Sequence, residues 1–157
     1  MEKLIIFSVA IGLLILIALF VLGYRSQSGS APGLADGKLQ PCPDSPNCVN
    51  SEYPLNAEHY IEPVVYSAHE TEQISDRVKL IIQQMRGTVN TEESDYLAAT
   101  FTSRIFGFVD DFEIRIDRAK NTIHVRSGSR IGHSDLGANR KRVENFKIAF
   151  RSKTGGS

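Results

Sequence analysis

Residues 108–117, FVDDFEIRID, and residues 122–129, TIHVRSGS, are two short segments in which apolar and polar residues alternate. Alternation with a period of two is typical of strands that bury one face, and the short connection at 118–121 predicts a β-hairpin. A slip by one residue would move every side chain to the other face, so the register is well determined. The expected pairs are Ile116 with Ile123, Ile114 with Val125, Arg115 with His124 and Glu113 with Arg126.

Three acidic residues of this hairpin are interpreted as structural carboxylates. Strict alternation places Asp110 on the apolar face, where a carboxylate has to be paired or hydrogen-bonded. Asp111 and Glu113 lie on the opposite face, which Arg126 and Arg130 share. Arginine–carboxylate pairs on that face are expected to brace the glycine-containing loop that follows the hairpin.

Further patterns predict three more strands and two helices. Thr71 is the expected N-cap of the first helix, and Gly87 is placed to end it. The order of elements predicts an α+β domain, with a mainly antiparallel sheet of about five strands and two helices on one side. The expected strands besides the hairpin are 61–67, 88–91 and 96–103, and the expected helices are 71–86 and 139–150.

The N-terminal stretch 4–24 contains 21 residues without a charge. About 20 helical residues cross a bilayer core of about 30 Å, so this stretch predicts one transmembrane helix. A cleaved signal peptide is the alternative, but its apolar region usually has only about 7–15 residues. Residues 25–40 are rich in Ser, Gly, Ala and Pro and predict a flexible tether, and 41–153 has the size of a single domain.

The two cysteines, Cys42 and Cys48, bracket the sequence Pro-Asp-Ser-Pro-Asn. This ring, pre-bent by two prolines, favours a local disulfide, and disulfides persist outside the cytoplasm. A pair of reduced cysteines in a cytoplasmic turn is the alternative, whereas the spacing suits neither a zinc site nor a C-x-x-C redox motif. We therefore expect a single-pass protein of the bacterial cytoplasmic (inner) membrane, with its C-terminal domain on the periplasmic or exterior side.

Four ordered motifs after the tether resemble those of a known family, the domain of unknown function 1499. The resemblance covers nearly the whole expected domain, and it implies a domain that is often membrane-anchored or exported. It brings no established activity. The motifs are Cys42-Pro-x-Ser-Pro-Asn-Cys48, Phe108-Val-Asp-Asp-Phe-Glu113, His124-Val-Arg-Ser-x-Ser-Arg-x-Gly132 and Ser134-Asp-Leu-Gly-x-Asn-Arg-x-Arg142.

Charge is unevenly distributed, although 18 Lys and Arg balance 18 Asp and Glu. Between 52 and 113 there are 12 acidic and 4 basic residues, and between 130 and 157 there are 7 basic and 2 acidic ones. One interpretation is that the basic last helix docks beside acidic strands. The other is an anion site at the start of that helix, which Asp135 or Asn139 would cap. The candidate ligand-binding residues are Arg126, Ser129, Arg130, Asp135, Asn139, Arg140 and Arg142.

The favoured function is a membrane-tethered, non-catalytic binding or assembly module of the cell envelope. Its expected partners are the membrane and an anionic small molecule, a lipid headgroup or an envelope protein. An envelope hydrolase that uses Ser and His of 124–135 is the alternative, although no G-x-S-x-G elbow is present. No cofactor is expected, since phosphate loops and dinucleotide fingerprints are missing. Asp110 and Asp111 point to opposite faces, so no metal site is expected there, and a net charge of zero disfavours nucleic acid.

Overall fold

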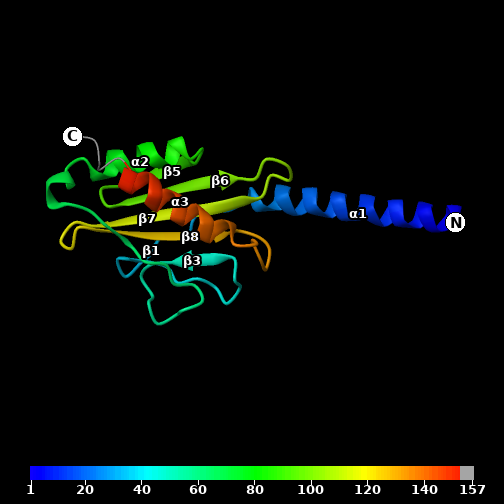
Figure 1. Cartoon of the computed structure of the whole chain (residues 1–157), viewed down its shortest axis with the longest axis horizontal. Coiled ribbons are helices and arrows are strands. Elements are labelled where there is room, and N and C mark those ends of the chain that lie inside the picture. The colour runs from blue at the N-terminus through cyan, green and yellow to red at the C-terminus, as the bar shows by residue number, and fades with distance from the viewer. Residues whose placement is uncertain (153–157) are drawn as a thin grey trace.

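The computed structural model describes residues 1–152 and shows an α+β domain preceded by a long helix. This helix, α1 (Glu2–Ser26), projects from one end of the domain, so that the N-terminus lies far from it (Figure 1). Among the described residues, α1 is the one helix long and apolar enough to cross a membrane. The mean hydropathy of its most apolar 18-residue window is 3.2.

The domain is built on a six-stranded sheet in which every pair of strands is antiparallel. Five strands follow the order β3-β8-β7-β6-β5, and β4 also pairs with β8. The strand bounds are β3 (Cys48–Asn50), β4 (Val64–Val65), β5 (Thr88–Glu92), β6 (Tyr96–Thr102), β7 (Val109–Asp117) and β8 (Thr122–Ser129). A separate two-stranded sheet joins β1 (Leu34–Ala35) to β2 (Lys38–Leu39).

The central hairpin β7–β8 has the register that alternation predicts. Ile116 lies opposite Ile123, and Glu113 lies opposite Arg126. Phe112, Ile114 and Ile116 are all buried on the face that packs against the helices, which confirms the predicted apolar face.

Two helices, α2 (Ile74–Gln84) and α3 (Ala138–Ser152), cover one face of the sheet (Figure 1). Each presents an apolar stripe to the sheet because its apolar residues recur every three or four positions. The fully buried members of these stripes are Ile74, Val78, Ile81 and Ile82 from α2, and Val143 and Phe146 from α3. The predicted α+β class, with both helices on one side, is therefore confirmed.

The start of α2 differs from the prediction. A short 3-10 helix, η1 (Ala68–Glu70), precedes it, and α2 itself begins only at Ile74. Thr71 does not cap α2, because its hydroxyl donates to the carbonyl of Ala68 at 2.7 Å. The expected strand at 61–67 is reduced to the two residues of β4.

The end of α2 also has a different cause from the one expected. Arg86, and not Gly87, adopts the left-handed conformation, with φ +69°. Gly87 is required by close packing instead, since a Cβ there would lie 2.7 Å from side-chain atoms of Ile82 and Phe101. The prediction of a stop at this position is correct, but the left-handed residue is Arg86, and Gly87 lies in close packing between α2 and Phe101 of β6.

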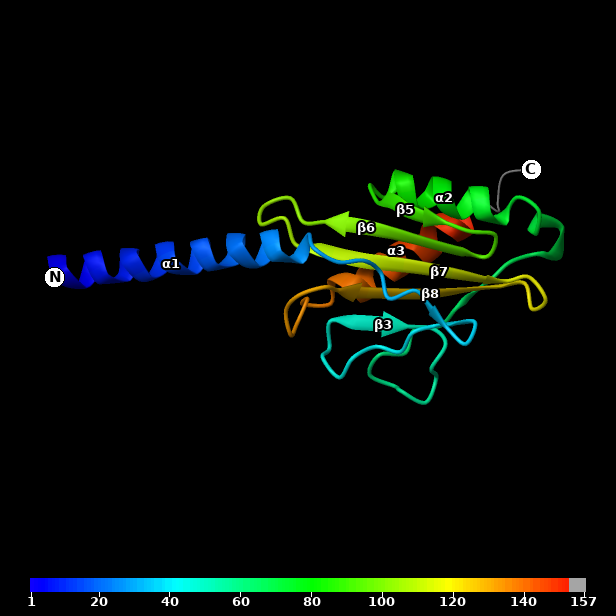
Figure 2. The same ribbon diagram turned by 180° about the vertical axis from the view of Figure 1, so that it is seen from behind.

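The segment expected to be a flexible tether is packed across the second face of the sheet (Figure 2). Leu39 is fully buried there against Tyr96 and Ala98 of β6. Its backbone N–H donates to the carboxylate of Glu52 at 2.5 Å. The prediction of a free tether is therefore wrong for these residues, because the apolar side chains on the second face of β6 require cover from water.

We expect two leucines of the β1–β2 hairpin to differ strongly in their contribution to stability. Leu39→Ala should lower the free energy of unfolding by about 2–5 kcal/mol, as is usual when a fully buried leucine is truncated. Leu34→Ala is the matched control and should have a small effect, because Leu34 is 40% exposed. Denaturation of the full chain in detergent micelles measures both, and equal effects would contradict the packed arrangement.

Candidate functional site

A closed hydrogen-bond network lies between β8 and the start of α3. The side chain of Asn139 is buried, and its amide donates to the Asn47 carbonyl and to the Ser129 hydroxyl, each at 2.9 Å. Its oxygen accepts from the Ser127 hydroxyl at 2.6 Å. Asn139 thus uses both ends of its amide inside the protein and holds α3 on the sheet.

Arg142 extends this network to the carboxylate predicted to be structural. It donates to Asp110 at 2.6 Å and to the Ser127 hydroxyl at 3.1 Å. It also donates to the side-chain oxygen of Asn139, and its guanidinium lies 4.8 Å from the ring centroid of Phe101. The structure therefore pairs Asp110 with an arginine, as its place on the apolar face predicts.

The opposite face of the hairpin carries a second network, centred on the fully buried Glu113. This carboxylate accepts from the backbone N–H of Gly33, from the Tyr96 hydroxyl and from the guanidinium of Arg126, each at 2.8 Å. Burial and the negative charge of Glu113 raise the pKa of Tyr96, so Tyr96 stays protonated and donates. Three segments of the chain are joined at this one side chain.

Arg130 forms a bidentate ion pair with Asp111 on the same face. Its Nε and Nη2 lie 2.9 and 2.7 Å from the carboxylate oxygens, and this hydrogen bonding raises the pKa of Arg130. Its Nη1 donates to the carbonyl of Gln27 at 3.3 Å, immediately after α1. The cation therefore also lies at the C-terminal, negative end of the helix dipole.

A cavity of about 260 Å³ opens between this second network and the chain that follows α1. Arg126 lies in its wall with only 6% of its surface exposed. The Nε of Arg126 is buried and has no hydrogen-bond partner within residues 1–152, although Nη1 of the same side chain is paired with Glu113. Other residues that line the cavity include Ser28, Ser30, Asp111, Gly128, Ser129 and Arg130.

The remaining predicted ligand residues do not join this cavity. Asp135 caps α3, because its carboxylate accepts from the backbone N–H groups of Gly137 and Asn139 at 3.0 and 2.7 Å. Arg140 donates to the carbonyls of Glu58 and Tyr60, each at 2.9 Å. The structure thus separates the predicted set, and the arginines at the start of α3 have protein partners.

Ser127 and His124, two of the residues considered for a hydrolase, have other partners in the described chain. The hydroxyl of Ser127 is fully buried and donates to Asn139. His124 lies instead beside Ser51 and Glu52, whose oxygens are 3.4 and 3.9 Å from the same ring nitrogen, Nδ1. A catalytic triad needs the serine and the acid on different nitrogens, which this geometry does not provide.

The structure also shows how the possible metal ligands and the two cysteines are arranged. Within residues 1–152, no group of three or more His, Cys, Asp or Glu is placed to hold a metal ion. Cys42 and Cys48 form a disulfide, as their spacing predicts, and Gly128 packs against it so closely that a Cβ would lie 3.2 Å from the Cys48 sulfur.

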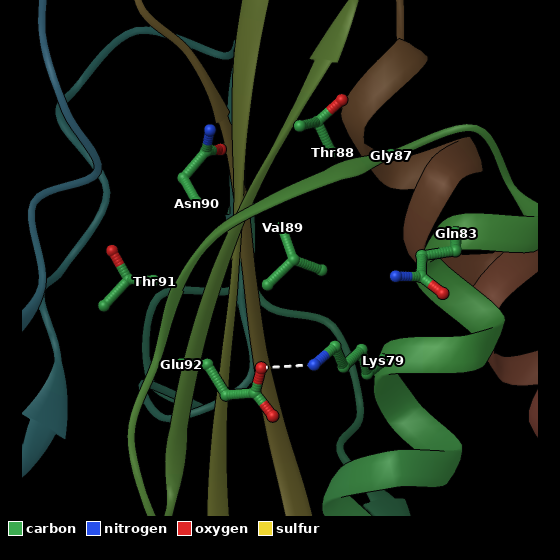
Figure 3. Close-up of a pocket in the computed structure, with 8 residues that line it drawn as sticks. All are labelled: Lys79, Gln83, Gly87, Thr88, Val89, Asn90, Thr91 and Glu92. Carbon is green, nitrogen blue, oxygen red and sulfur yellow. Dashed lines mark hydrogen bonds and ion pairs between the residues drawn. The ribbon is translucent and has the colours of Figure 1, made fainter.

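A larger hollow of about 420 Å³ lies between α2 and the edge strand β5 (Figure 3). Lys79 of α2 and Glu92 of β5 face each other across it and form an ion pair of 2.5 Å. The other labelled side chains carry amides, hydroxyls or the apolar Val89. Because its one cation is already paired in Figure 3, this hollow is a weaker candidate than the Arg126 cavity.

Sequence analysis missed three residues on which the sites depend. Glu52 is almost fully buried and pairs with Arg115 at 2.5 Å. Asn47 donates to the Gly132 carbonyl at 2.5 Å, so the disulfide ring supports the loop before α3. Gly33 reaches Glu113 through its backbone. Of the three, only Asn47 could have been singled out from the sequence, because it is one of the specified residues of the first motif.

We expect His124 to make stability depend on pH. Burial is the main cause that lowers the pKa of His124 from 6.5, although the charge of Glu52 acts in the opposite direction. The unfolded chain therefore binds a proton at this residue at a higher pH than the folded chain, and the free energy of unfolding should fall as the pH drops below 6.5. His124→Gln should reduce this fall, whereas His69→Gln, at an exposed position, should not.

Denaturation of the full chain in micelles at several pH values between about 5 and 7.5 measures this dependence. An unchanged pH dependence in His124→Gln would contradict the assignment.

The four sequence motifs meet in the fold, and they lie within the part of the chain that a family model matches. Residues from all four motifs, namely Asn47, Asp110, Ser127 and Asn139, meet in the network under α3. No curated protein matches the chain. A family model described as "Protein of unknown function (DUF1499)" matches residues 38–150. The match covers well over half of the sequence, and the chain therefore belongs to the DUF1499 family.

Proposed function

We propose that this protein is a membrane-tethered, non-catalytic binding module of the cell envelope that holds an anionic group in the Arg126 cavity. The observation that carries the proposal is the buried, unpartnered Nε of Arg126, a residue that lines a cavity. A buried polar group without a partner costs about 1–3 kcal/mol, and more where the group is charged. A ligand that accepts a hydrogen bond would remove that cost.

The chemistry of the cavity favours a small anionic group. Its volume of about 260 Å³ lies just below the usual range for drug-sized ligands, roughly 300–1,000 Å³. Ser28 and Ser30 also line it, and their hydroxyls are candidate further donors. Since Asp111 and Glu113 already balance the two arginines, we expect a phosphate or carboxylate to bind there with modest affinity.

The proposed location follows from α1 and the disulfide. The apolar helix is long enough for one crossing of a membrane, and disulfides persist in oxidising compartments. The protein is therefore proposed to reside in the bacterial inner membrane, with the domain on the periplasmic side.

Inorganic phosphate should stabilise the full chain in micelles relative to chloride at equal ionic strength. At about ten times the dissociation constant the gain is about 1.4 kcal/mol, which appears as a higher Tm. Arg126→Gln should abolish the phosphate-induced shift, because it removes the unpartnered donor. Arg140→Gln is the matched control and should keep the shift, since Arg140 contacts only backbone carbonyls.

Arg126→Gln also breaks the pair with Glu113, so a second variant separates binding from folding. Ser30→Phe, at an exposed position in the cavity wall, should retain the wild-type Tm without phosphate and lose the shift. A wild-type chain without a phosphate shift, or a shift that survives both Arg126→Gln and Ser30→Phe, would refute the proposed site.

The proposed topology predicts that a reporter active only in the periplasm works when it is fused after Ser157. It also predicts that Cys42 and Cys48 carry no free thiol in the native protein, because the domain folds in an oxidising compartment. Alkylation of the unreduced chain followed by mass spectrometry measures the thiols. A silent periplasmic reporter together with alkylated cysteines would place the domain in the cytoplasm.

A further inference from the structure

Two loops at the α1 end of the domain expose large apolar side chains. The first connects β6 to β7 and carries Ile105, which is 73% exposed. The second connects β8 to α3 and carries Leu136, which is 97% exposed. Both loops extend from the domain toward the side on which α1 leaves it (Figure 1; Figure 2).

Leu136 is unusual in its backbone as well as in its exposure. Its φ is +53°, in the left-handed region that glycine or asparagine adopts more easily. A leucine at such a position pays a conformational cost and gains no contact with the domain core. Contacts outside the domain core are therefore the ones that can offset this cost.

Contacts with α1 fix the height of these loops along the helix. The Phe106 ring lies 5.2 Å from the ring of Phe20, in an edge-to-face arrangement. Gly23 packs directly on the first loop, since a Cβ there would lie 1.7 Å from the Phe106 carbonyl oxygen. The hydroxyl of Ser26 accepts from the backbone N–H of Val109 at 2.9 Å. The domain is thus held against the last two turns of α1.

The length of α1 places these contacts at the edge of a bilayer. The charge of Lys3 marks one side of the apolar stretch, and a core of about 30 Å corresponds to about 20 helical residues, which end near Gly23. Phe20 and Gly23, and the loop that touches them, therefore lie at the boundary between hydrocarbon and headgroups. Any tilt of the helix would bring the loops deeper.

A pocket of about 470 Å³ lies at the same height, between α1 and the two loops. Its walls are mainly apolar, with polar groups of Asp110, Ser129, Ser134 and Asp135 at one side. Asp110 is paired with Arg142, and Asp135 caps α3. The apolar lining is formed by Leu19 and Leu22 of α1, Phe106 and Phe108 of the first loop, and Ile131 and Leu136 of the second.

We infer that this end of the domain is a lipid-binding surface, in which Ile105 and Leu136 insert into the bilayer interface and the pocket takes an acyl chain of a membrane lipid. The inference rests on the proposed membrane anchoring and is independent of the anion cavity. Apolar side chains of amphipathic surfaces bury about 5–10 Å into the headgroup–acyl boundary. Seven residues separate Leu19 from Ser26, a rise of about 10 Å, which matches this depth.

The charge at this end agrees with a lipid surface. Arg25 follows the apolar stretch of α1, and the exposed Arg104 precedes Ile105 in the first loop. Basic residues beside a membrane are attracted to lipid phosphates by about 1 kcal/mol each where the lipids are anionic. A cation next to an apolar side chain at the tip of a loop is therefore suited to the boundary between headgroups and hydrocarbon.

Single tryptophans test the inference directly, because the chain has none of its own. Ile105→Trp and Leu136→Trp are placed in the full-length protein, which is reconstituted in phosphatidylcholine vesicles. Vesicles with bromine near the headgroup end of the acyl chain should quench both tryptophans more strongly than vesicles with bromine near the methyl end. Leu55→Trp, at a fully exposed position remote from α1 in the sequence, is the matched control and should not be quenched.

Phe108→Trp reports on the pocket, and Ile131→Trp gives a second reading if the first variant fails to fold. Quenching of these two tryptophans by brominated chains would show that an acyl chain enters the pocket. If they are not quenched while Leu136→Trp is quenched, the acyl-chain part of the inference is refuted.

Leu13→Trp, in the middle of α1, reports on the anchoring itself. If Leu13→Trp is quenched and both loop tryptophans are not, the lipid surface is refuted and the anchoring stands; if Leu13→Trp is not quenched, the anchoring fails.

Discussion

The carboxylate of Glu113 is buried completely, and it is satisfied by donors from three segments that are distant in sequence. Removing one partner of a buried ion pair typically costs about 3–5 kcal/mol, because an uncompensated charge is left behind. The second face of the sheet therefore forms as a unit. Strand β8 supplies Arg126, β6 supplies the Tyr96 hydroxyl, and the chain after α1 has to dock so that Gly33 reaches the same oxygen as Tyr96. With this docking, Leu39 covers the apolar part of β6.

This constraint links the apolar helix α1 to the domain. Once residues 27–40 are held on the sheet, α1 has little freedom to swing, and Arg130 adds a further link from Asp111 to the carbonyl of Gln27. The arrangement differs from a globular head on a flexible stalk, in which position and orientation at the membrane would be averaged. In the proposed membrane-anchored state, a domain held close to α1 would present the same loops and cavities to the membrane surface.

The parts of the fold that the sequence predicted are those whose cause is local. Alternation in β7 and β8 sufficed to predict the register and the separate faces of Asp110 and Asp111, and it required a partner for Asp110 without identifying it as Arg142. The packing of residues 27–40 was missed, because Gly33 and Leu39 show no periodicity and their partners lie 80 residues away or on another strand. The sites were predicted less well than the fold. The arginines at the start of α3 look like an anion site in sequence, but their partners are carbonyls and a carboxylate supplied by distant loops and strands.

The two cavities also lie at one end of the molecule, because Ser129 at the end of β8 contributes to both. One cavity is polar and has an unpartnered guanidinium nitrogen in its wall, and the other is mainly apolar and adjoins α1. Both are supported by buried networks that contain residues of the family motifs, including Asn139 under α3 and Glu113 on the opposite face. A buried polar network that is fully satisfied gives rigidity, and an unpartnered group within it is costly because the local dielectric constant is low. The anion cavity and the apolar pocket proposed above therefore both lie where the domain meets α1, on a sheet that these networks hold in shape.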